Sequence, residues 1–355
     1  MNNVLLDHFF SPKEPFFPPP RLRPHQSVPP LKTDEIAAAL SKCSPTSASG
    51  PDGIPYSTWK QVNKINTSIL LQILAPLVLL GYHPAWLKSS NGVVLDKPAQ
   101  PSHQSHSAFR IIVLICTFSK ILERIIAARL LTAARLRGLW HPNQCGSLPG
   151  LSTYHACLTL TNEVKTLQRP RLKVSSLFVD IKAGFENVDN NTVARMLSEG
   201  CIRLYLVSWV SSFLGQRSCT LIFQVATGTP APVNLAAPQG SPISPLLFLL
   251  YVAPLHFPTP LGLMISYVAD FALTVASRPS STVATSAGSR ISTRGLKARR
   301  PTSASPFRSP KRNYSTGGPR ARGTRQSVPH VFRLKESILP LHLCLVARVV
   351  VHSSP

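Results

Sequence analysis

The sequence predicts a mixed α/β fold, and three observations favour this class. The chain has 355 residues, of which 44% are hydrophobic, enough for one large or two ordinary domains with a sizeable core. Residues 31–277 alternate between segments with helical spacing of apolar residues and short β-branched runs. Glycine and proline turns separate these segments, for example at 49–53.

Helices are predicted where apolar residues recur every three or four positions. These segments are 33–42, 59–80, 119–136, 152–168, 192–199, 204–214 and one that begins at 245. Thr33 is placed to cap the first helix. Pro76 is expected to divide the second helix into two pieces, because proline cannot donate the helical hydrogen bond.

The helix 119–136 has the clearest separation of two faces. Aliphatic residues share one face: Ile121, Leu122, Ile125, Ile126, Leu130 and Leu131. The charged residues are expected to lie largely off that face: Lys120, Glu123, Arg124 and Arg129. The pattern predicts a helix that packs on the core through its aliphatic side.

Strands are predicted at 92–97, 110–117, 174–179 and 219–225, which are short, apolar and rich in β-branched residues. The longest apolar stretch, 246–268, contains Pro254, Pro258 and Pro260. Because these prolines break a membrane helix, the stretch is predicted as a buried helix, a turn and a strand, and no membrane partner is expected.

The charge is strongly positive, with 38 Lys and Arg against 14 Asp and Glu, a net charge of +24. Such a surplus favours a polyanionic partner, usually nucleic acid. The alternative is a basic disordered tail without a partner. Residues 278–355 contain 15 Lys and Arg and one acid, Glu336, so a mostly disordered basic tail is predicted there, with 338–351 as an isolated apolar segment. The expected organisation is a Pro-rich leader (1–30), one domain (31–277) and this tail.

The seven cysteines are scattered and include no C-x-x-C pair. This pattern favours neither a structural zinc site nor a disulfide framework. An intracellular setting, nuclear or cytoplasmic, is therefore expected.

Three short motifs could carry chemistry. Asp180 follows an apolar strand, where a carboxylate in a cleft can bind Mg²⁺. The P-Q-G loop at 238–240 places an amide side chain beside a glycine that permits close backbone approach. The segment 267–270, Y-V-A-D, lies between two apolar runs at a predicted hairpin. Alone, each motif also fits a common feature: an Asp that caps a turn, a turn before a helix, or a surface hairpin.

The order of these motifs is more specific than any one of them. An Asp-bearing strand, a P-Q-G loop and a Y-x-x-D hairpin, in this order, resemble the reverse transcriptase domain of non-LTR (LINE-type) retrotransposons. Further blocks agree in order: G-P-D-G-I at 50–54, F-R-I-I at 109–112, S-K-I-L-E-R at 119–124, N-Q-C-G at 143–146 followed by S-T at 152–153, and S-F-L at 212–214 with Arg217. The resemblance covers about residues 31–277.

The resemblance implies a right-hand polymerase with fingers, a palm built on an antiparallel sheet, and no thumb in the chain after 277. It implies addition of deoxynucleoside triphosphates to a DNA primer on an RNA template, with Mg²⁺ or Mn²⁺ as cofactor. The implied catalytic and metal-binding residues are Asp180 and Asp270. The implied contacts to the incoming nucleotide are Phe185, which would exclude a 2′-OH, Gln239 and Gly240, Arg110 at the triphosphate, and Lys97 beside it.

One departure from the family pattern bears on activity. Ala269 occupies the position of the first acid of the Y-x-D-D box, so a loss of several orders of magnitude in rate is expected. Asp270 is not expected to replace it, because neighbouring residues of a strand face opposite sides. Two alternatives to an enzyme stay open: a non-catalytic nucleic-acid-binding remnant and a product without function. The composition after 277 also raises the hypothesis of a shifted reading frame, which translation of the encoding DNA in all frames would test.

Overall fold

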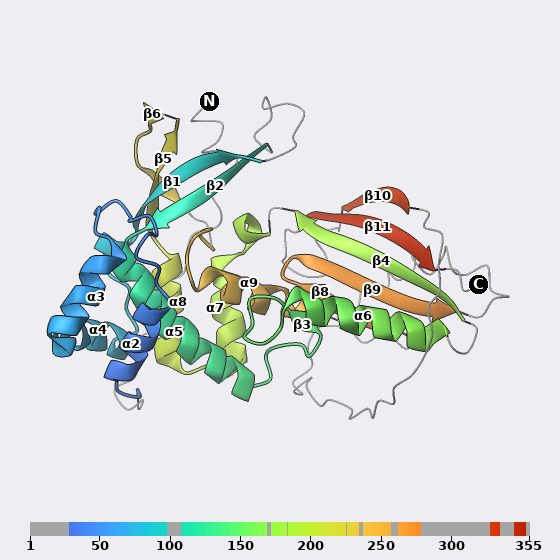
Figure 1. Cartoon of the computed structure of the whole chain (residues 1–355), viewed down its shortest axis with the longest axis horizontal. Helices are drawn as coiled ribbons and strands as arrows, with labels where there is room; N and C mark the ends of the chain where they lie inside the picture. Colours follow the sequence, from blue (N-terminus) through green and yellow to red (C-terminus); the bar gives the residue numbers. More distant parts are fainter. Residues whose placement is uncertain are drawn as a thin grey trace. The chain divides into compact units, whose positions relative to one another are not determined.

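The computed structural model describes residues 28–97, 108–168, 172–182, 184–224, 226–233, 237–256, 262–277, 327–333 and 344–352 (Figure 1). The chain divides into two compact units. The first comprises Met1–Arg137 and Phe185–Tyr251, and the second comprises Gly138–Gly184 and Val252–Pro355. Each unit combines a sheet with helices, so the predicted mixed α/β class is confirmed.

A five-stranded sheet forms one part of the first unit. Its strands are β1 (Ser89–Asp96), β2 (Phe109–Ile115), β5 (Arg217–Phe223), β6 (Ala226–Thr227) and β7 (Ala231–Val233). The order is β2-β1-β5-β6, with β7 also on β5, and β1 pairs with β5 in parallel. Alternate residues of β2 are buried in an apolar cluster with Leu221, while Arg110 between them is exposed. This alternation gives the sheet one face in the core.

The helices of the first unit are α2 (Thr33–Ser41), α3 (Tyr56–Ile65), α4 (Thr67–Leu79), α5 (Thr117–Leu136), α7 (Asn190–Glu199), α8 (Leu204–Leu214) and α9 (Ser244–Val252). Short 3-10 turns lie at Ala85–Leu87 and Phe185–Asn187. The helix α8 is buried from Tyr205 to Leu214, which agrees with its mostly apolar sequence. The predicted bounds of α8 are confirmed.

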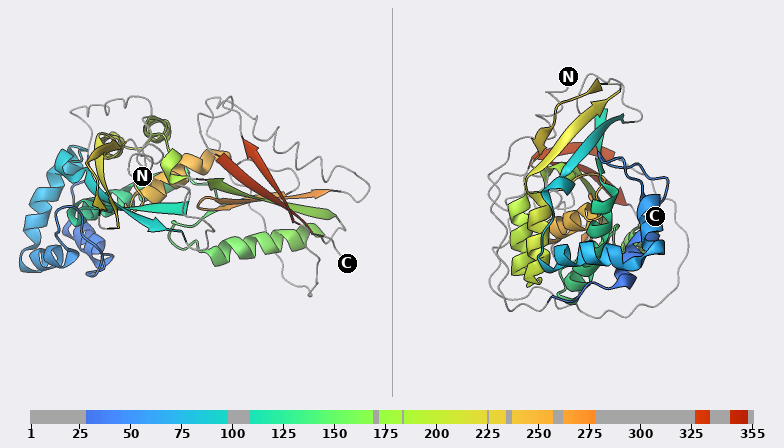
Figure 2. Two further views of the ribbon diagram at one scale, coloured as in Figure 1. Left: turned by 90° about the horizontal axis from the view of Figure 1, so that it is seen from above. Right: turned by 90° about the vertical axis from the view of Figure 1, so that its left-hand side faces the viewer.

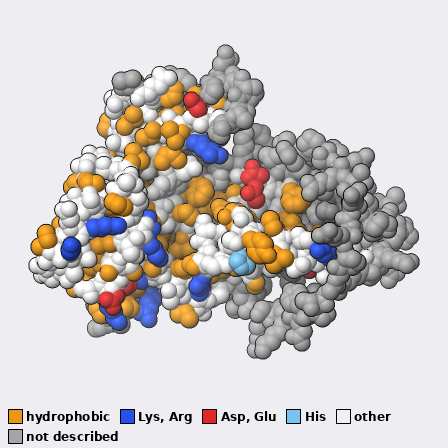
Figure 3. All heavy atoms as spheres, viewed as in Figure 1, with side chains coloured by type: hydrophobic (Ala, Val, Ile, Leu, Met, Phe, Trp, Pro, Cys, Tyr) orange, Lys and Arg blue, Asp and Glu red, His pale blue; other side chains and the backbone are white. Residues whose placement is uncertain are grey.

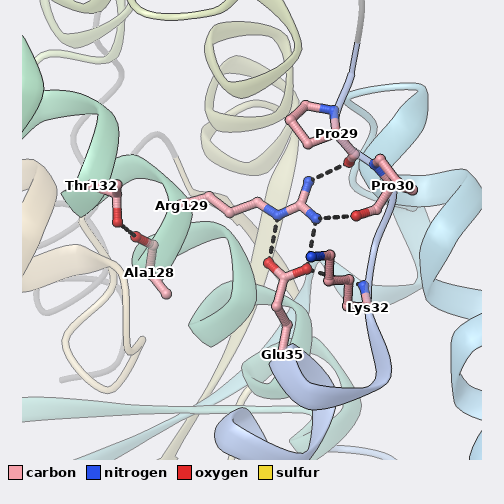
Figure 4. A network of polar contacts seen from close by, with 7 residues as sticks. All are labelled: Pro29, Pro30, Lys32, Glu35, Ala128, Arg129 and Thr132. Atoms are coloured by element: carbon pink, nitrogen blue, oxygen red, sulfur yellow. Dashed lines mark hydrogen bonds and ion pairs between the residues drawn. The ribbon is translucent and has the colours of Figure 1, made fainter.

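A polar network joins α2 to α5 (Figure 4). The Arg129 guanidinium donates Nε to Glu35 Oε1 at 2.7 Å and Nη2 to Glu35 Oε2 at 2.8 Å, a bidentate pair. It also donates to the carbonyl oxygens of Pro29 (2.9 Å) and Pro30 (3.0 Å). The backbone N–H of Lys32 donates to Glu35 Oε2 at 3.1 Å, so Glu35 also caps the start of α2.

The second unit contains a six-stranded sheet in the order β10-β11-β4-β9-β8-β3. Its strands are β3 (Gln144–Cys145), β4 (Lys173–Lys182), β8 (Gly262–Tyr267), β9 (Asp270–Ser277), β10 (Ser327–Arg333) and β11 (Cys344–His352). The helix α6 (Thr153–Gln168) lies along one face of this sheet (Figure 2). Ala156 and Leu160 of α6 pack there against the buried residues Cys145, Ile265 and Ala272.

Two predictions about helix ends are wrong. The segment 59–80 is divided at Asn66 and not at Pro76, which lies inside α4. Asn66 ends α3 and caps α4, because its side-chain oxygen accepts the N–H of Ser68 at 3.0 Å. Thr33 is the first residue of α2, and the cap position belongs to Lys32.

The charged residues of α5 also differ from the prediction. Lys120 (9% exposed) and Glu123 (0%) are buried, although both were expected largely off the packed face. The first half of α5 is enclosed on nearly all sides, so the helical pattern underestimates how much of it is covered. Arg124 and Arg129 are partly exposed.

The segment 338–351 is not isolated, because residues 344–352 form β11, which pairs antiparallel with β4. Residues 278–326 lie outside the described residues, and the predicted division at 30 and 277 stays a prediction. Among the described residues, no single helix is long and apolar enough to cross a membrane; α3 and α4 pass together by length and composition but are bent by 112°. The stretch 246–268 forms α9, a 3-10 turn and β8, as predicted for a helix, a turn and a strand.

Candidate active site

Two carboxylates meet in the sheet of the second unit. Asp180 lies in β4, two residues before its end, and Asp270 is the first residue of β9. They are direct partners in the antiparallel register of these strands. Side chains directly opposite each other share one face of a sheet, and both are exposed here.

The electrostatics agree with this proximity. Partial burial, followed by the negative charge of Asp270, raises the pKa of Asp180 above its usual value. Two like charges side by side disfavour ionisation of both, and a bound cation would relieve that repulsion. Residue 269 is a turn residue, so Asp270 begins the strand directly opposite Asp180 in register; that Asp270 does not replace the acid missing at 269 stays a prediction.

The turn that carries Ala269 is tight and held on two sides. Val268 and Ala269 are its central residues, and Tyr267 pairs with Asp270 across it. Val268 has φ = 54°, a conformation that β-branched residues rarely adopt. The Val268 N–H donates to Cys145 O, and Ala269 O accepts from the Ile181 N–H, each at 3.1 Å. The turn is thus fixed to β3 and β4 in a strained geometry of the kind found at functional sites.

Gly146 lies directly against the side chains of the same turn. Its φ is +81°, and a Cβ at this position would lie 2.7 Å from Val268 Cγ2 and 3.0 Å from Tyr267 Cε2. A side chain would therefore push the turn away. The preceding Asn143 anchors β8 as well, since its Nδ2 donates to Met264 O at 3.1 Å and its carbonyl accepts from the Ser266 N–H at 3.0 Å.

The donor set of the carboxylate pair fits Mg²⁺ or Mn²⁺, which prefer hard oxygen ligands. Within the part of the chain that the structure describes, no group of three or more His, Cys, Asp or Glu side chains could hold a metal ion. Ala269 offers only its carbonyl oxygen, which already accepts from Ile181. The site therefore offers two acidic side chains, where a Y-x-D-D box together with Asp180 would offer three.

The predicted nucleotide contacts lie in the first unit. Arg110 on β2 is exposed, pairs with Leu95 in register, and is flanked by the buried residues Phe109 and Ile111. Lys97 follows β1, and its N–H donates to Ala108 O at 2.8 Å, which closes the same hairpin. The structure thus brings Arg110 and Lys97 to one end of the β1–β2 hairpin.

Gln239 and Gly240 are both exposed in the loop before α9. The Gln239 carbonyl accepts from the Val113 N–H of β2 at 2.7 Å. Gly240 has φ = +133°, and a Cβ there would collide with the Val113 carbonyl oxygen. Only glycine fits at 240, and the loop lies directly against the β1–β2 hairpin that carries Arg110.

Phe185 is half-buried and stacks on Phe248 of α9, with ring centroids 4.8 Å apart and planes 25° apart. This contact fixes the ring to the helix that follows the P-Q-G loop. The five predicted nucleotide contacts all belong to the first unit: Phe185, Gln239, Gly240, Arg110 and Lys97. Asp180 and Asp270 both belong to the second unit.

Few acidic side chains show on the face drawn in Figure 3, where Lys and Arg side chains are spread between hydrophobic ones. This agrees with the composition of the chain. The sequence interpretation assigned no role to Gly146, Asn143 or Glu123. The glycine in the N-Q-C-G block was the signal that could have predicted a close approach of backbone at 146.

The sequence matches the family described as "Reverse transcriptase (RNA-dependent DNA polymerase)" over residues 96–298. It is 26% identical over 224 residues to the "Probable RNA-directed DNA polymerase from transposon X-element" of Drosophila melanogaster, which covers 63% of this chain and 24% of that protein. It is 28% identical over 248 residues to the "Putative 115 kDa protein in type-1 retrotransposable element R1DM" of the same organism, which covers 69% of this chain and 23% of that protein.

A further relative is a retroelement protein from another organism. The "Retrovirus-related Pol polyprotein from type-1 retrotransposable element R2" of Popillia japonica is 23% identical over 222 residues, which covers 62% of this chain and 29% of that protein. The chain spans about a quarter of the length of the curated relatives it matches.

Proposed function

Because the chain belongs to the reverse transcriptase family, we propose that it provides the fingers and palm of an RNA-directed DNA polymerase encoded by a non-LTR retroelement. The resemblance to that class of element, predicted from the ordered motifs, is confirmed by the family match and the relatives. The substrates are an RNA template, a DNA primer and deoxynucleoside triphosphates.

One observation carries this proposal: Asp180 and Asp270 are direct cross-strand partners at a Y-V-A-D hairpin. Two adjacent carboxylates on one face of a sheet are suited to hold Mg²⁺ or Mn²⁺. When bound, such an ion supplies the Lewis acidity that activates a primer 3′-OH and stabilises the charge of the triphosphate. The protein's part is to fix these two oxygen ligands on paired strands of one sheet.

In this proposal the first unit binds the incoming nucleotide. The exposed guanidinium of Arg110 binds triphosphate oxygens through its fork of N–H donors, and Lys97 adds a positive charge at the same hairpin end. Gln239 covers the nucleotide from a loop whose backbone is fixed on β2. Phe185, held on Phe248, excludes a 2′-OH from the sugar.

Ala269 sets the level of activity. A methyl group at this turn position provides no anionic ligand, so the chain catalyses the reaction slowly. Loss of a metal ligand lowers the rate by several orders of magnitude, and each factor of ten corresponds to about 1.4 kcal/mol of transition-state stabilisation.

Primer extension tests the proposal. The purified chain is given an RNA template with an annealed DNA primer, deoxynucleoside triphosphates, and Mg²⁺ or Mn²⁺. We expect slow incorporation by the unmodified chain, none by Asp180→Ala, and at least about a hundredfold faster incorporation by Ala269→Asp. If Ala269→Asp incorporates no more than the double variant Asp180→Ala/Ala269→Asp, the polymerase proposal is refuted.

A second function, nucleic-acid binding without catalysis, is favoured by two observations together. The net charge is +24, and the turn that should supply an acid supplies Ala269. In this case RNA and DNA bind through phosphate contacts, and affinity falls steeply with salt. Salt-sensitive binding by the unmodified chain, with no incorporation by any variant, would favour this function over the enzyme.

We expect the protein to act inside the cell, in the nucleus or cytoplasm.

A further inference from the structure

A fully buried carboxylate connects α5 to the P-Q-G loop within the first unit. Glu123 has an exposed fraction of 0%. Its Oε1 accepts from Ser119 Oγ of the same helix at 2.7 Å, and its Oε2 accepts from Ser241 Oγ through a short hydrogen bond. Ser241 directly follows Gly240, so one hydroxyl joins the end of the loop to a helix that lies 118 positions earlier in the chain.

The other contacts of the loop point the same way. The Val113 N–H donates to the Gln239 carbonyl at 2.7 Å, and Gly240 lies against the Val113 carbonyl. The Ser241 N–H donates to Pro238 O at 3.1 Å, and Ser241 Oγ accepts from the Ile243 N–H at 3.3 Å. The backbone of the loop is therefore fixed from β2 and from α5, while the Gln239 side chain is exposed.

A carboxylate is a costly residue for such a buried position. Burial raises the pKa of Glu123, and the hydrogen bonds from Ser241 and Ser119 and the positive charges of Arg217 and Lys120 oppose that rise. Arg217 is itself buried, donates Nη1 to Phe213 O at 3.1 Å and lies 4.7 Å from the centroid of the Phe213 ring. Well-packed apolar residues at a buried site often stabilise a protein as much as a buried charge does. Stability alone therefore does not explain an acid at 123, whereas a role in positioning the loop does.

We propose that Glu123 and Ser241 are positioning residues, which hold the P-Q-G loop so that Gln239 meets the incoming nucleotide. Neither residue touches the nucleotide; both act through the backbone of 238–241. The proposal rests on the proposed function for the role of Gln239, whereas the anchoring itself can be measured without any catalysis.

Hydrogen exchange tests the anchoring with a matched pair of variants. Ser241→Ala and Ser119→Ala each remove one serine donor from Glu123, but only the first releases the loop. In Ser241→Ala we expect exchange at the amides of Val113 and of residue 241 to accelerate about ten- to a hundredfold, as for loss of a hydrogen bond to a charged group. In Ser119→Ala the exchange rates of these amides should stay within about threefold of those in the unmodified chain. Ser241→Thr keeps a hydroxyl group, so these amides should exchange as slowly as in the unmodified chain. Equal acceleration in both alanine variants, or none in Ser241→Ala, would overturn the proposal.

Kinetics then test the link to the nucleotide. The same variants are made in the Ala269→Asp background and assayed by primer extension. Ser241→Ala should raise KM for the deoxynucleoside triphosphate at least about tenfold with kcat within about threefold, and Ser119→Ala should change neither by more than about threefold. An unchanged KM in Ser241→Ala, in a background that does incorporate, would overturn the positioning role.

The two failures are distinguishable. No incorporation in the Ala269→Asp background refutes the proposed polymerase, and hydrogen exchange still decides whether Glu123 and Ser241 anchor the loop. If Ser241→Ala does not fold, Ser241→Cys, which keeps only a weak donor, replaces it in both assays.

Discussion

Replacing Asp180 by asparagine is expected to stabilise the protein while removing its affinity for divalent metal. In the native sheet, Asp180 and Asp270 are direct partners, and burial together with the Asp270 charge raises the pKa of Asp180. A pKa raised by folding means that the ionised pair opposes folding at neutral pH. Asp180→Asn keeps the shape of the side chain and removes that opposition.

The size of the effect follows from the position of the pair. Side chains directly opposite on antiparallel strands lie about 5 Å apart. Two like charges at that separation repel by about 3 kcal/mol at an effective dielectric constant of about 20, and by about 0.8 kcal/mol in water. Both side chains are exposed, so solvent screening dominates and like charges in this arrangement cost roughly 0.2–1 kcal/mol. We expect Asp180→Asn to gain that amount in the free energy of unfolding.

The pH dependence has a definite sign. Because the folded pKa of Asp180 is raised above its reference value of 3.8, the native state binds the proton more tightly than the unfolded state. The stability of the unmodified protein relative to Asp180→Asn should therefore be highest below about pH 3.8 and should fall as pH rises through the raised pKa.

Thermal unfolding with and without Mg²⁺ is the assay. The unmodified protein should gain about 1.4 kcal/mol when the Mg²⁺ concentration is ten times the dissociation constant, and Asp180→Asn should gain much less. Glu199→Gln removes an exposed acid of the other unit and serves as the control. It should change neither the free energy of unfolding at neutral pH nor the stabilisation by Mg²⁺. An Asp180→Asn variant that is less stable at neutral pH, or that keeps the full Mg²⁺ shift, would refute the reasoning.

Three further predictions concern stability. Arg129→Ala should lower the free energy of unfolding by about 1.5–3 kcal/mol, because the bidentate pair with Glu35 is lost. The hydrogen bond from Arg129 also lowers the pKa of Glu35. Urea unfolding at several pH values should therefore show the stabilisation by ionised Glu35 in full above pH 4.5, and its loss as pH falls through the lowered pKa. Val268→Gly should stabilise the hairpin by about 1 kcal/mol in urea unfolding by relieving φ = 54°, and a loss instead would show that the Val268 side chain contributes more than its strain costs. Gly146→Ala should destabilise by about 1–3 kcal/mol, and Val268→Ala in the same chain should recover part of this in a double-mutant cycle; strict additivity would contradict the predicted collision.

The features that the sequence predicted well are those determined by local pattern. The helical spacing at 204–214 and the β-branched apolar run at 110–117 predicted α8 and β2, because each segment carries its own local signal. The hairpin between β8 and β9 was predicted from two apolar runs around Val268 and Ala269. The break at Asn66 was also within reach, because asparagine before a helical segment is a favoured cap, and this capping outweighed Pro76.

The features that were missed depend on partners far away in the sequence. Glu123 occupies a helical position that a surface charge would also occupy, and only its contact with Ser241 accounts for its burial. The pairing of β11 with β4 joins segments more than 160 residues apart, for which no local signal exists. The register that places Asp270 opposite Asp180 was not predicted, because residue 269 was treated as part of a strand, whereas it is a turn residue and the strand begins at Asp270.

The contact of Arg129 with residues 29 and 30 has a consequence for how the chain can diverge. The guanidinium binds the carbonyl oxygens of Pro29 and Pro30 and none of their side-chain atoms (Figure 4). Every residue type has a carbonyl oxygen, so this anchor tolerates substitution at both positions as long as the backbone keeps its course. The position of residues 29 and 30 on this unit is therefore set by Arg129, which Glu35 holds, and does not depend on the side chains at 29 and 30.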